Sequence, residues 1–334
     1  MDIMLKKAIL HIVDRESGSP VFSQVPLDLT KEYVREYLTK KIQKLSNPQT
    51  KTGTLSAEAV FTKLVKDSQE TFTMASEAMT ARWYESYSQS EDAPSCDVFV
   101  VLYEVDVTPY LAFVKVNYHE GYTHFVEGSE KGVANQLIIN RALLANKTQK
   151  ADEGLTVNLE TLFYGLIEKK YTFSGEKRLY FSTEVIESEA QLSLEDNVKV
   201  ITKVAAKIGQ KFEAPQHDLV ADVKESIYDS IEESGELDVA MVAEKVFKDN
   251  ITAQMTFKEE VVEKGFVDRA PLVEEVKELT EKKYGKQKLR LSNGIELIVP
   301  LEVYRDPNLI EFINNPDGTI SVTIKNVEDV INRL

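Results

Sequence analysis

The chain has 334 residues, 43% of them hydrophobic and 28% charged, which is the composition of a globular protein long enough for two domains. Its net charge of −15 excludes a protein that is basic throughout, so any nucleic-acid contact must be a local basic surface. No apolar run approaches the roughly 20 residues of a membrane span, and Met1 does not begin a secretion leader. The single cysteine, Cys96, excludes an internal disulfide. We therefore expect a cytoplasmic protein.

The first half of the chain predicts an antiparallel sheet with helices packed on it. An opening strand is expected at 5–13, and apolar residues at helical spacing then predict helices at 30–45, from 56, and at 68–87. The period afterwards changes to that of strands, which we expect at 97–105, 110–118, 122–126, 135–144, 156–159, 163–173 and 179–183. Short loops between these strands favour an antiparallel meander, because parallel strands need long crossovers.

The second half is predicted to be helical until close to its end. Helices are expected at 194–212, 218–233, 237–247, 256–264 and 271–284, followed by hairpins of 289–291 with 295–299 and of 309–313 with 320–324, and by a short helix at 327–334. We therefore predict an α+β fold in three parts. These are an α+β domain with the meander at 1–193, a helical segment at 194–286 whose first helix is basic and whose remainder is acidic, and C-terminal hairpins with a short helix at 287–334.

A regular row of lysines marks the helix expected at 194–212. Lys199, Lys203, Lys207 and Lys211 recur every four residues and form one stripe at helical pitch, while the apolar residues fall mainly on another face. Like charges at this spacing each cost about 0.2–0.5 kcal/mol in an isolated helix, so four in a row need an explanation. Two interpretations stay open: a solvated face opposite a core stripe, and a ridge that neutralises DNA phosphates.

Two further pairs of basic residues are candidates for phosphate binding. They are Lys169-Lys170 and Lys177-Arg178, and each pair is followed closely by a tyrosine. Cations release counterions from phosphates and aromatic rings stack on bases, so this combination is typical of nucleic-acid binding, although the same residues also suit ordinary strand ends. We expect contacts to the phosphate backbone and not base readout, because Gln, Asn and Arg are not grouped on one helix.

The sequence contains no motif for catalysis or for a cofactor. It lacks the Gly-x-Ser-x-Gly, Gly-x-Gly-x-x-Gly and Gly-Lys-Ser/Thr patterns of nucleophilic and phosphate-binding loops. His119 and His124 flank a turn beside carboxylates, which is a usable zinc ligand set, but no companion ligand motif accompanies them. Cys96 has no neighbouring histidine to activate it, so burial is expected. We predict no enzyme, no cofactor and no metal.

Three segments resemble the bacterial nucleoid-associated proteins of the NdpA-like family, and the likeness runs from the first strand to the last. They are Arg178-Leu-Tyr-Phe181, which leads into the basic helix, Met255-Thr-Phe-Lys-Glu-Glu-Val-Val-Glu-Lys-Gly265, and Ile310-Glu-Phe-Ile-Asn-Asn-Pro-Asp-Gly-Thr-Ile-Ser-Val-Thr-Ile-Lys-Asn326. The resemblance implies a cytoplasmic, non-enzymatic protein of the nucleoid that binds DNA and contacts DNA-handling proteins. It implies no particular base-contacting residue.

These observations together predict a non-enzymatic, homo-oligomeric nucleoid-associated protein that binds duplex DNA through phosphate contacts with weak sequence preference. The alternative is an adaptor for a DNA-processing factor such as a topoisomerase. Its basis is the segment 213–281, where nineteen acidic and seven basic residues give a net charge of −12. A basic helix so close to this segment can also bind it, until DNA competes for the lysines.

Overall fold

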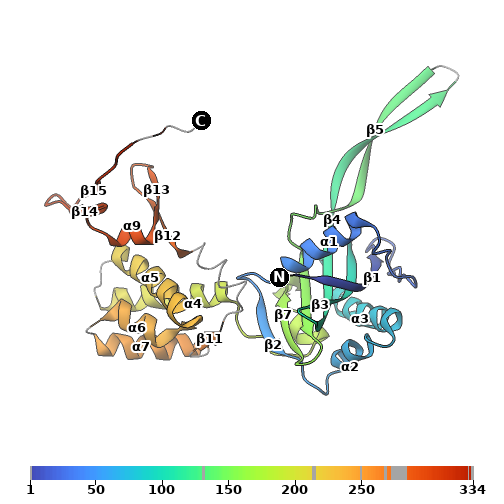
Figure 1. Cartoon of the computed structure of the whole chain (residues 1–334), viewed down its shortest axis with the longest axis horizontal. Coiled ribbons are helices and arrows are strands. Elements are labelled where there is room, and N and C mark those ends of the chain that lie inside the picture. Colours follow the sequence, from blue (N-terminus) through green and yellow to red (C-terminus); the bar gives the residue numbers. More distant parts are fainter. Residues whose placement is uncertain are drawn as a thin grey trace. The chain divides into compact units, whose positions relative to one another are not determined.

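The computed structural model describes residues 2–129, 132–212, 216–248, 250–266, 269–271, 284–329 and 331. The chain forms two compact units, Met1–Ser193 and Leu194–Leu334 (Figure 1). The first unit is an antiparallel sheet with helices, and the second is a group of helices with small hairpins, so the predicted α+β fold class is confirmed. The C-terminal hairpins belong to the second unit.

The sheet of the first unit is antiparallel throughout. Its strands lie in the order β1 (Met4–Val13), β3 (Cys96–Val105), β4 (Thr108–Ser129), β6 (Glu153–Asn158), β7 (Phe163–Ile167) and β2 (Lys51–Thr54), and β5 (Gly132–Leu144) pairs with β4. Strand β2 was not predicted; it comes from earlier in the sequence than β3 and adds an edge strand beside β7. Its glycine, Gly53, is required there, since an added Cβ would lie 2.5 Å from the hydroxyl of Tyr164.

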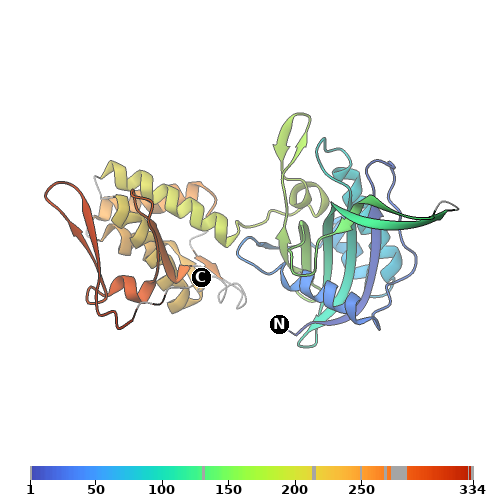
Figure 2. The ribbon, with the colours of Figure 1, turned by 90° about the horizontal axis from the view of Figure 1, so that it is seen from above.

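Helices cover both faces of this sheet, which explains the unbroken apolar run of β3. On one face, helix α1 (Glu32–Gln43) buries Leu38 against Phe99. On the other face, helices α2 (Val60–Asp67) and α3 (Phe72–Tyr87) pack with alternate β3 residues such as Val98 (Figure 2). A strand buried on both sides reads as continuously hydrophobic.

Five predicted elements of the first unit differ from the structure. The strand expected at 122–126 is part of β4, and the one at 163–173 divides into β7 and β8 (Tyr171–Phe173). The strand at 179–183 is wrong: β9 (Glu176–Arg178) ends before it, and η1 (Phe181–Val185) is one turn of π-helix. Phe181 and Val185 are buried in the α3 side of the core, so tertiary packing overrides the local strand pattern. The second and third helices begin later than predicted, at Val60 and Phe72.

The second unit has its own core, which is built by four helices of the part of the chain that the structure describes. They are α4 (Leu194–Lys211), α5 (Gln216–Ser234), α6 (Val239–Phe247) and α7 (Ile251–Glu263). Around them lie β10 (Glu236–Asp238) with β11 (Arg269–Pro271), β12 (Lys286–Arg290) with β13 (Glu296–Pro300), α9 (Leu301–Arg305), and β14 (Ile310–Asn314) with β15 (Ile320–Ile324). The helix predicted at 271–284 falls almost entirely outside the described residues. The helix predicted at 327–334 is wrong where the chain is described, because 327–329 and 331 are not helical.

The β3–β4 turn contains a residue with a strained backbone conformation, and a substitution can remove this strain. Asp106 and Val107 have φ values of 48° and 72°, the left-handed region that two-residue hairpin turns require. A β-branched side chain is disfavoured there, and Val107 is 85% exposed, so it gains no burial in return. We expect Val107→Gly to raise the free energy of unfolding by about 1 kcal/mol in urea denaturation. The exposed Val25, which lacks a positive φ, is the control: Val25→Gly should give no gain.

A buried histidine makes the stability of the first unit depend on pH. His11 is fully buried on β1, where Nδ1 accepts a hydrogen bond from the backbone N–H of Ser23 at 3.1 Å and Nε2 lies 3.3 Å from Oγ of Ser76. Burial lowers the pKa of His11 to about 4. The unfolded chain binds this proton near pH 6.5, so the contribution of His11 is complete above that pH and is lost as pH falls toward 4.

Urea denaturation at several pH values measures this linkage. Between pH 7 and 4.5 we expect the wild type to lose about 2 kcal/mol more stability than His11→Asn, which keeps polar atoms at the site but does not titrate. Parallel stability curves for the two proteins would show that His11 is not the titrating group.

Candidate nucleic-acid interface

Helix α4 presents a basic face to solvent because its opposite face is held in the core of the second unit. Leu194, Val198, Ile201, Val204, Ala205 and Ile208 are buried, at the three- and four-residue spacing of one helix face. The four lysines occupy the other side, where all are exposed. We call Lys199, Lys203, Lys207 and Lys211 the lysine stripe. The structure thus brings together the residues predicted from spacing, in an arrangement that fits both a solvated face and a phosphate-binding ridge.

The four lysines differ in their partners. Lys199 Nζ lies 3.3 Å from Oδ1 of Asp196 and 3.6 Å from Oε1 of Glu195, both one turn earlier on α4. Lys207 Nζ donates to both carboxylate oxygens of Glu260, at 2.8 and 2.9 Å. Within the described part of the chain, Lys203 and Lys211 form no ion pair. Among the described residues, the stripe therefore has two lysines with a carboxylate partner and two without one.

The pair of Lys207 with Glu260 joins the stripe to the acidic segment. Glu260 lies on α7, which packs against α4, and its side chain is 22% exposed against 68% for Lys207. Ion pairs this open to water contribute about 0–1 kcal/mol. A phosphate can therefore replace the Glu260 carboxylate at small cost.

The other predicted cations lie around the β8–β9 hairpin of the first unit. The strand register places Arg178 opposite Tyr171 and Lys177 opposite Thr172, with Lys170 directly before β8. Arg178 pairs with Glu184 and lies 4.6 Å above the ring of Phe173. Lys169 Nζ lies 2.7 Å from Oδ1 of Asp152. Lys170 and Lys177 are exposed, and neither forms an ion pair with a described residue.

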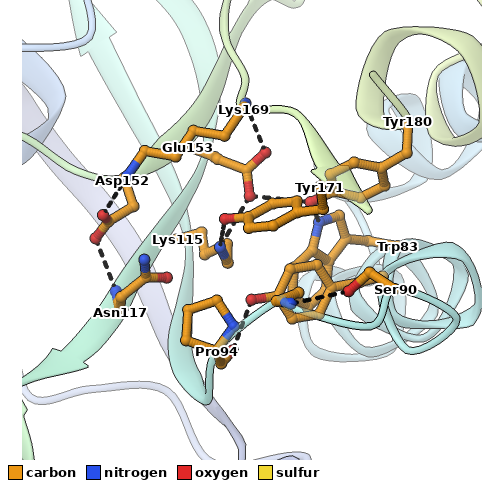
Figure 3. A network of polar contacts seen from close by, with 12 residues as sticks. Trp83, Ser90, Pro94, Lys115, Asn117, Asp152, Glu153, Lys169, Tyr171 and Tyr180 are labelled. Atoms are coloured by element: carbon orange, nitrogen blue, oxygen red, sulfur yellow. Dashed lines mark hydrogen bonds and ion pairs between the residues drawn. The ribbon is translucent and has the colours of Figure 1, made fainter. Parts of the chain in front are cut away.

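A buried polar network beneath this hairpin was not predicted from the sequence (Figure 3). Lys115 Nζ donates to Oε2 of Glu153 at 2.9 Å and to the Tyr171 hydroxyl at 2.7 Å. The Tyr180 hydroxyl donates to the same Glu153 oxygen at 3.0 Å and accepts from Nε1 of Trp83 at 2.9 Å. Lys115 and Glu153 are fully buried. The signal in the sequence was a lysine within the apolar strand 110–116.

The network corrects the expectation that the tyrosines beside the basic pairs stack on bases. Tyr171 is 6% exposed and Tyr180 is fully buried. Burial raises the pKa of both hydroxyls far above the ordinary value, so both stay protonated; Tyr180 donates to Glu153, and Tyr171 accepts from Lys115. Their rings stabilise the first unit and present no surface to a nucleic acid.

The candidate residues for metal binding or nucleophilic chemistry do not form a site. Among the described residues, no three His, Cys, Asp or Glu side chains gather in a group that could hold a metal ion. His119 and His124 both lie on β4, opposite Leu143 and Leu137. Cys96 is buried, and burial raises its pKa to about 12. The described part of the chain also has no helix long and apolar enough to span a membrane.

The protein has an α+β fold, and its candidate site is a charged surface formed by the lysines of one exposed helix. The family model described as nucleoid-associated protein YejK matches residues 9–332 of this chain. The chain therefore belongs to this family of bacterial nucleoid-associated proteins, and its place in the cell is the nucleoid, in the cytoplasm. A search of curated proteins finds no match.

Proposed function

We propose that this nucleoid-associated protein is non-enzymatic and binds duplex DNA through its lysine stripe, by contacts to phosphates. The observation that supports the proposal is the placement of four lysines on the exposed face of one helix, about 6 Å apart along its axis. Lysine is a mobile point charge that suits phosphate oxygens and carries no base preference. Binding of this kind is weakly sequence-selective and falls steeply with salt.

The exposed Lys170 and Lys177 supply further phosphate contacts in this proposal. Lys169 and Arg178 contribute less to phosphate binding, because each forms an ion pair with a carboxylate of the first unit that must break before it can contact DNA. The acidic residues near the stripe set its affinity, since Glu260 competes with phosphate for Lys207.

Removing the internal competitor tests this proposal through a gain of binding. We expect Glu260→Gln to raise the affinity for duplex DNA about threefold, because Lys207 is then free to contact phosphate. For the same reason, the slope of log affinity against log salt should increase in magnitude by up to about one. Fluorescence anisotropy with a labelled duplex, between 50 and 200 mM salt, measures both quantities.

The control is Glu259→Gln, which removes the same charge from the preceding position of α7, where the side chain is exposed. Equal gains in the two variants would mean that only net charge matters. Absence of salt-dependent binding by the wild type would contradict the proposed function itself.

The alternative is an acidic adaptor for a DNA-processing protein such as a topoisomerase. It is supported by exposed carboxylates on the helices of the second unit, namely Glu232, Glu233, Glu244, Glu259 and Glu263. Such a surface fits a basic partner. Pull-down with the full chain from nuclease-treated lysate separates the two functions: a partner that survives nuclease supports the adaptor, and loss of every partner with the DNA contradicts it.

A further inference from the structure

Strand β4 continues far beyond the sheet to which it belongs. Residues 108–117 pair with β3 and β6, but from Tyr118 onward β5 is the only strand among the described residues that pairs with β4. The paired strands, residues 118–129 and 132–144, project from the first unit (Figures 1 and 2). We call them the arm. A two-stranded hairpin without a further layer is at best marginally stable in water, so its side chains are expected to be covered.

The register of the arm separates its side chains into two faces. Directly paired residues share a face, so Tyr122 with Ile139, His124 with Leu137, Val126 with Asn135, and Gly128 with Val133 lie on one side. This side, the apolar face, carries large exposed side chains: Tyr122 (66%), Val126 (54%), Val133 (74%), Leu137 (75%) and Ile139 (45%). The opposite face carries the pairs Thr123 with Ile138, Phe125 with Gln136, and Glu127 with Ala134. The arm is therefore amphipathic, although no described residue of the first unit covers either face.

We propose that the apolar face of the arm binds the same face of a second copy of this chain and forms a symmetric dimer. A twofold interface uses one patch on both partners, and an apolar patch is complementary to itself. The exposed fractions correspond to about 550 Å² on each arm, so two facing arms bury about 1,100 Å², slightly more than the ~1,000 Å² expected of a specific interface. An exposed patch of this size is typical of a protein-binding surface.

Charge distinguishes this partner from DNA. The two strands of the arm carry two acidic residues, Glu120 and Glu127, and one basic residue, Arg141, a net charge of −1. A β-ribbon that enters a DNA groove needs an excess of cations to neutralise phosphates. Two nearly neutral arms do not repel one another. The proposal is independent of the lysine stripe, but a dimer carries two stripes, and simultaneous contact by both increases the affinity for one duplex.

Sedimentation equilibrium of the full chain tests the proposal with two matched double variants. Val126→Glu with Leu137→Glu alters the apolar face, at positions diagonal to each other in the register. Phe125→Glu with Ile138→Glu makes the same change in charge and removes two large apolar side chains at equivalent diagonal positions of the opposite face. We expect a dimeric wild type, a dissociation constant raised about 100-fold or more in the first variant, and a change of less than about fivefold in the second.

Three outcomes overturn the proposal. The first is a wild type that is monomeric at all concentrations, and the second is equal effects of the two double variants. The third is loss of DNA binding in the first variant with an unchanged mass, which would assign the apolar face to nucleic acid. Thermal unfolding followed by circular dichroism shows that each variant is folded, as expected because all four positions are exposed.

Cysteine crosslinking provides a second measurement that leaves the apolar face largely intact. The only native cysteine, Cys96, is fully buried, so background crosslinking is low. We expect Leu137→Cys, on the apolar face, to give covalent dimers with a short bismaleimide at micromolar protein. The neighbouring Gln136→Cys, on the opposite face, should give few. Equal yields at the two positions would contradict a face-specific dimer.

Discussion

Replacing Glu153 by alanine is expected to lower the free energy of unfolding of the first unit by about 3–5 kcal/mol, because the substitution leaves a buried charge without its partner. Glu153 is the counterion of Lys115, and both side chains are fully buried. Its carboxylate also accepts hydrogen bonds from the Tyr180 hydroxyl and from the backbone N–H of Lys169. Without it, a buried ammonium keeps one hydroxyl partner and no counterion, and two further donors lose their acceptor.

The chain provides a local probe for this measurement. Trp83 is the only tryptophan, it is fully buried, and its indole N–H donates to Tyr180 in the same network. Its fluorescence during urea denaturation therefore follows the first unit separately from the second. This separation is needed because a chain with two compact units does not have to unfold in one step.

The matched control replaces both members of the ion pair by apolar residues. Lys115→Met with Glu153→Leu leaves no buried charge, so we expect it to be clearly more stable than Glu153→Ala. A loss of less than about 1 kcal/mol in Glu153→Ala, or a double variant that is less stable than the single one, would show that the pair does not hold the network together.

Reversing two charges of the lysine stripe is expected to weaken duplex-DNA binding about 10- to 100-fold at 0.1 M salt. The variant is Lys203→Glu with Lys207→Glu. Each lysine that neutralises a phosphate releases about 0.9 counterion, so the slope of log affinity against log salt should decrease in magnitude by about two. Both side chains point away from the core, and the fold should not change.

The control for this variant is Lys63→Glu with Lys66→Glu on α2, two exposed helical lysines outside the proposed interface. It changes the net charge by the same amount. We expect a much smaller loss of affinity and an unchanged salt slope. If the two double variants bind DNA equally, the lysine stripe is not the contact and the protein acts through its overall field or through another surface.

The sequence was sufficient to predict the elements that are determined by the spacing of residues within one segment. The three- and four-residue spacing of Val198, Ile201 and Ala205 predicted α4 and the exposure of its lysines, because a helix with one apolar stripe must bury it. Alternation and turn residues predicted the antiparallel pairing of β3 with β4 and of β14 with β15. The family, too, was recognisable from packing and turn segments spread along the chain.

Other features depend on residues that are distant in the sequence, and only the tertiary structure could decide them. Lys207 meets Glu260 across 53 positions, and Lys115 meets Glu153 across 38, so neither pair leaves a local signal of its partner. Packing against α3 makes a π-helical turn of a segment whose composition suits a strand. In the sequence, the arm cannot be distinguished from any other pair of strands. The alternation of residues in a strand shows which of its faces is apolar, but it does not show whether another part of the chain covers that face.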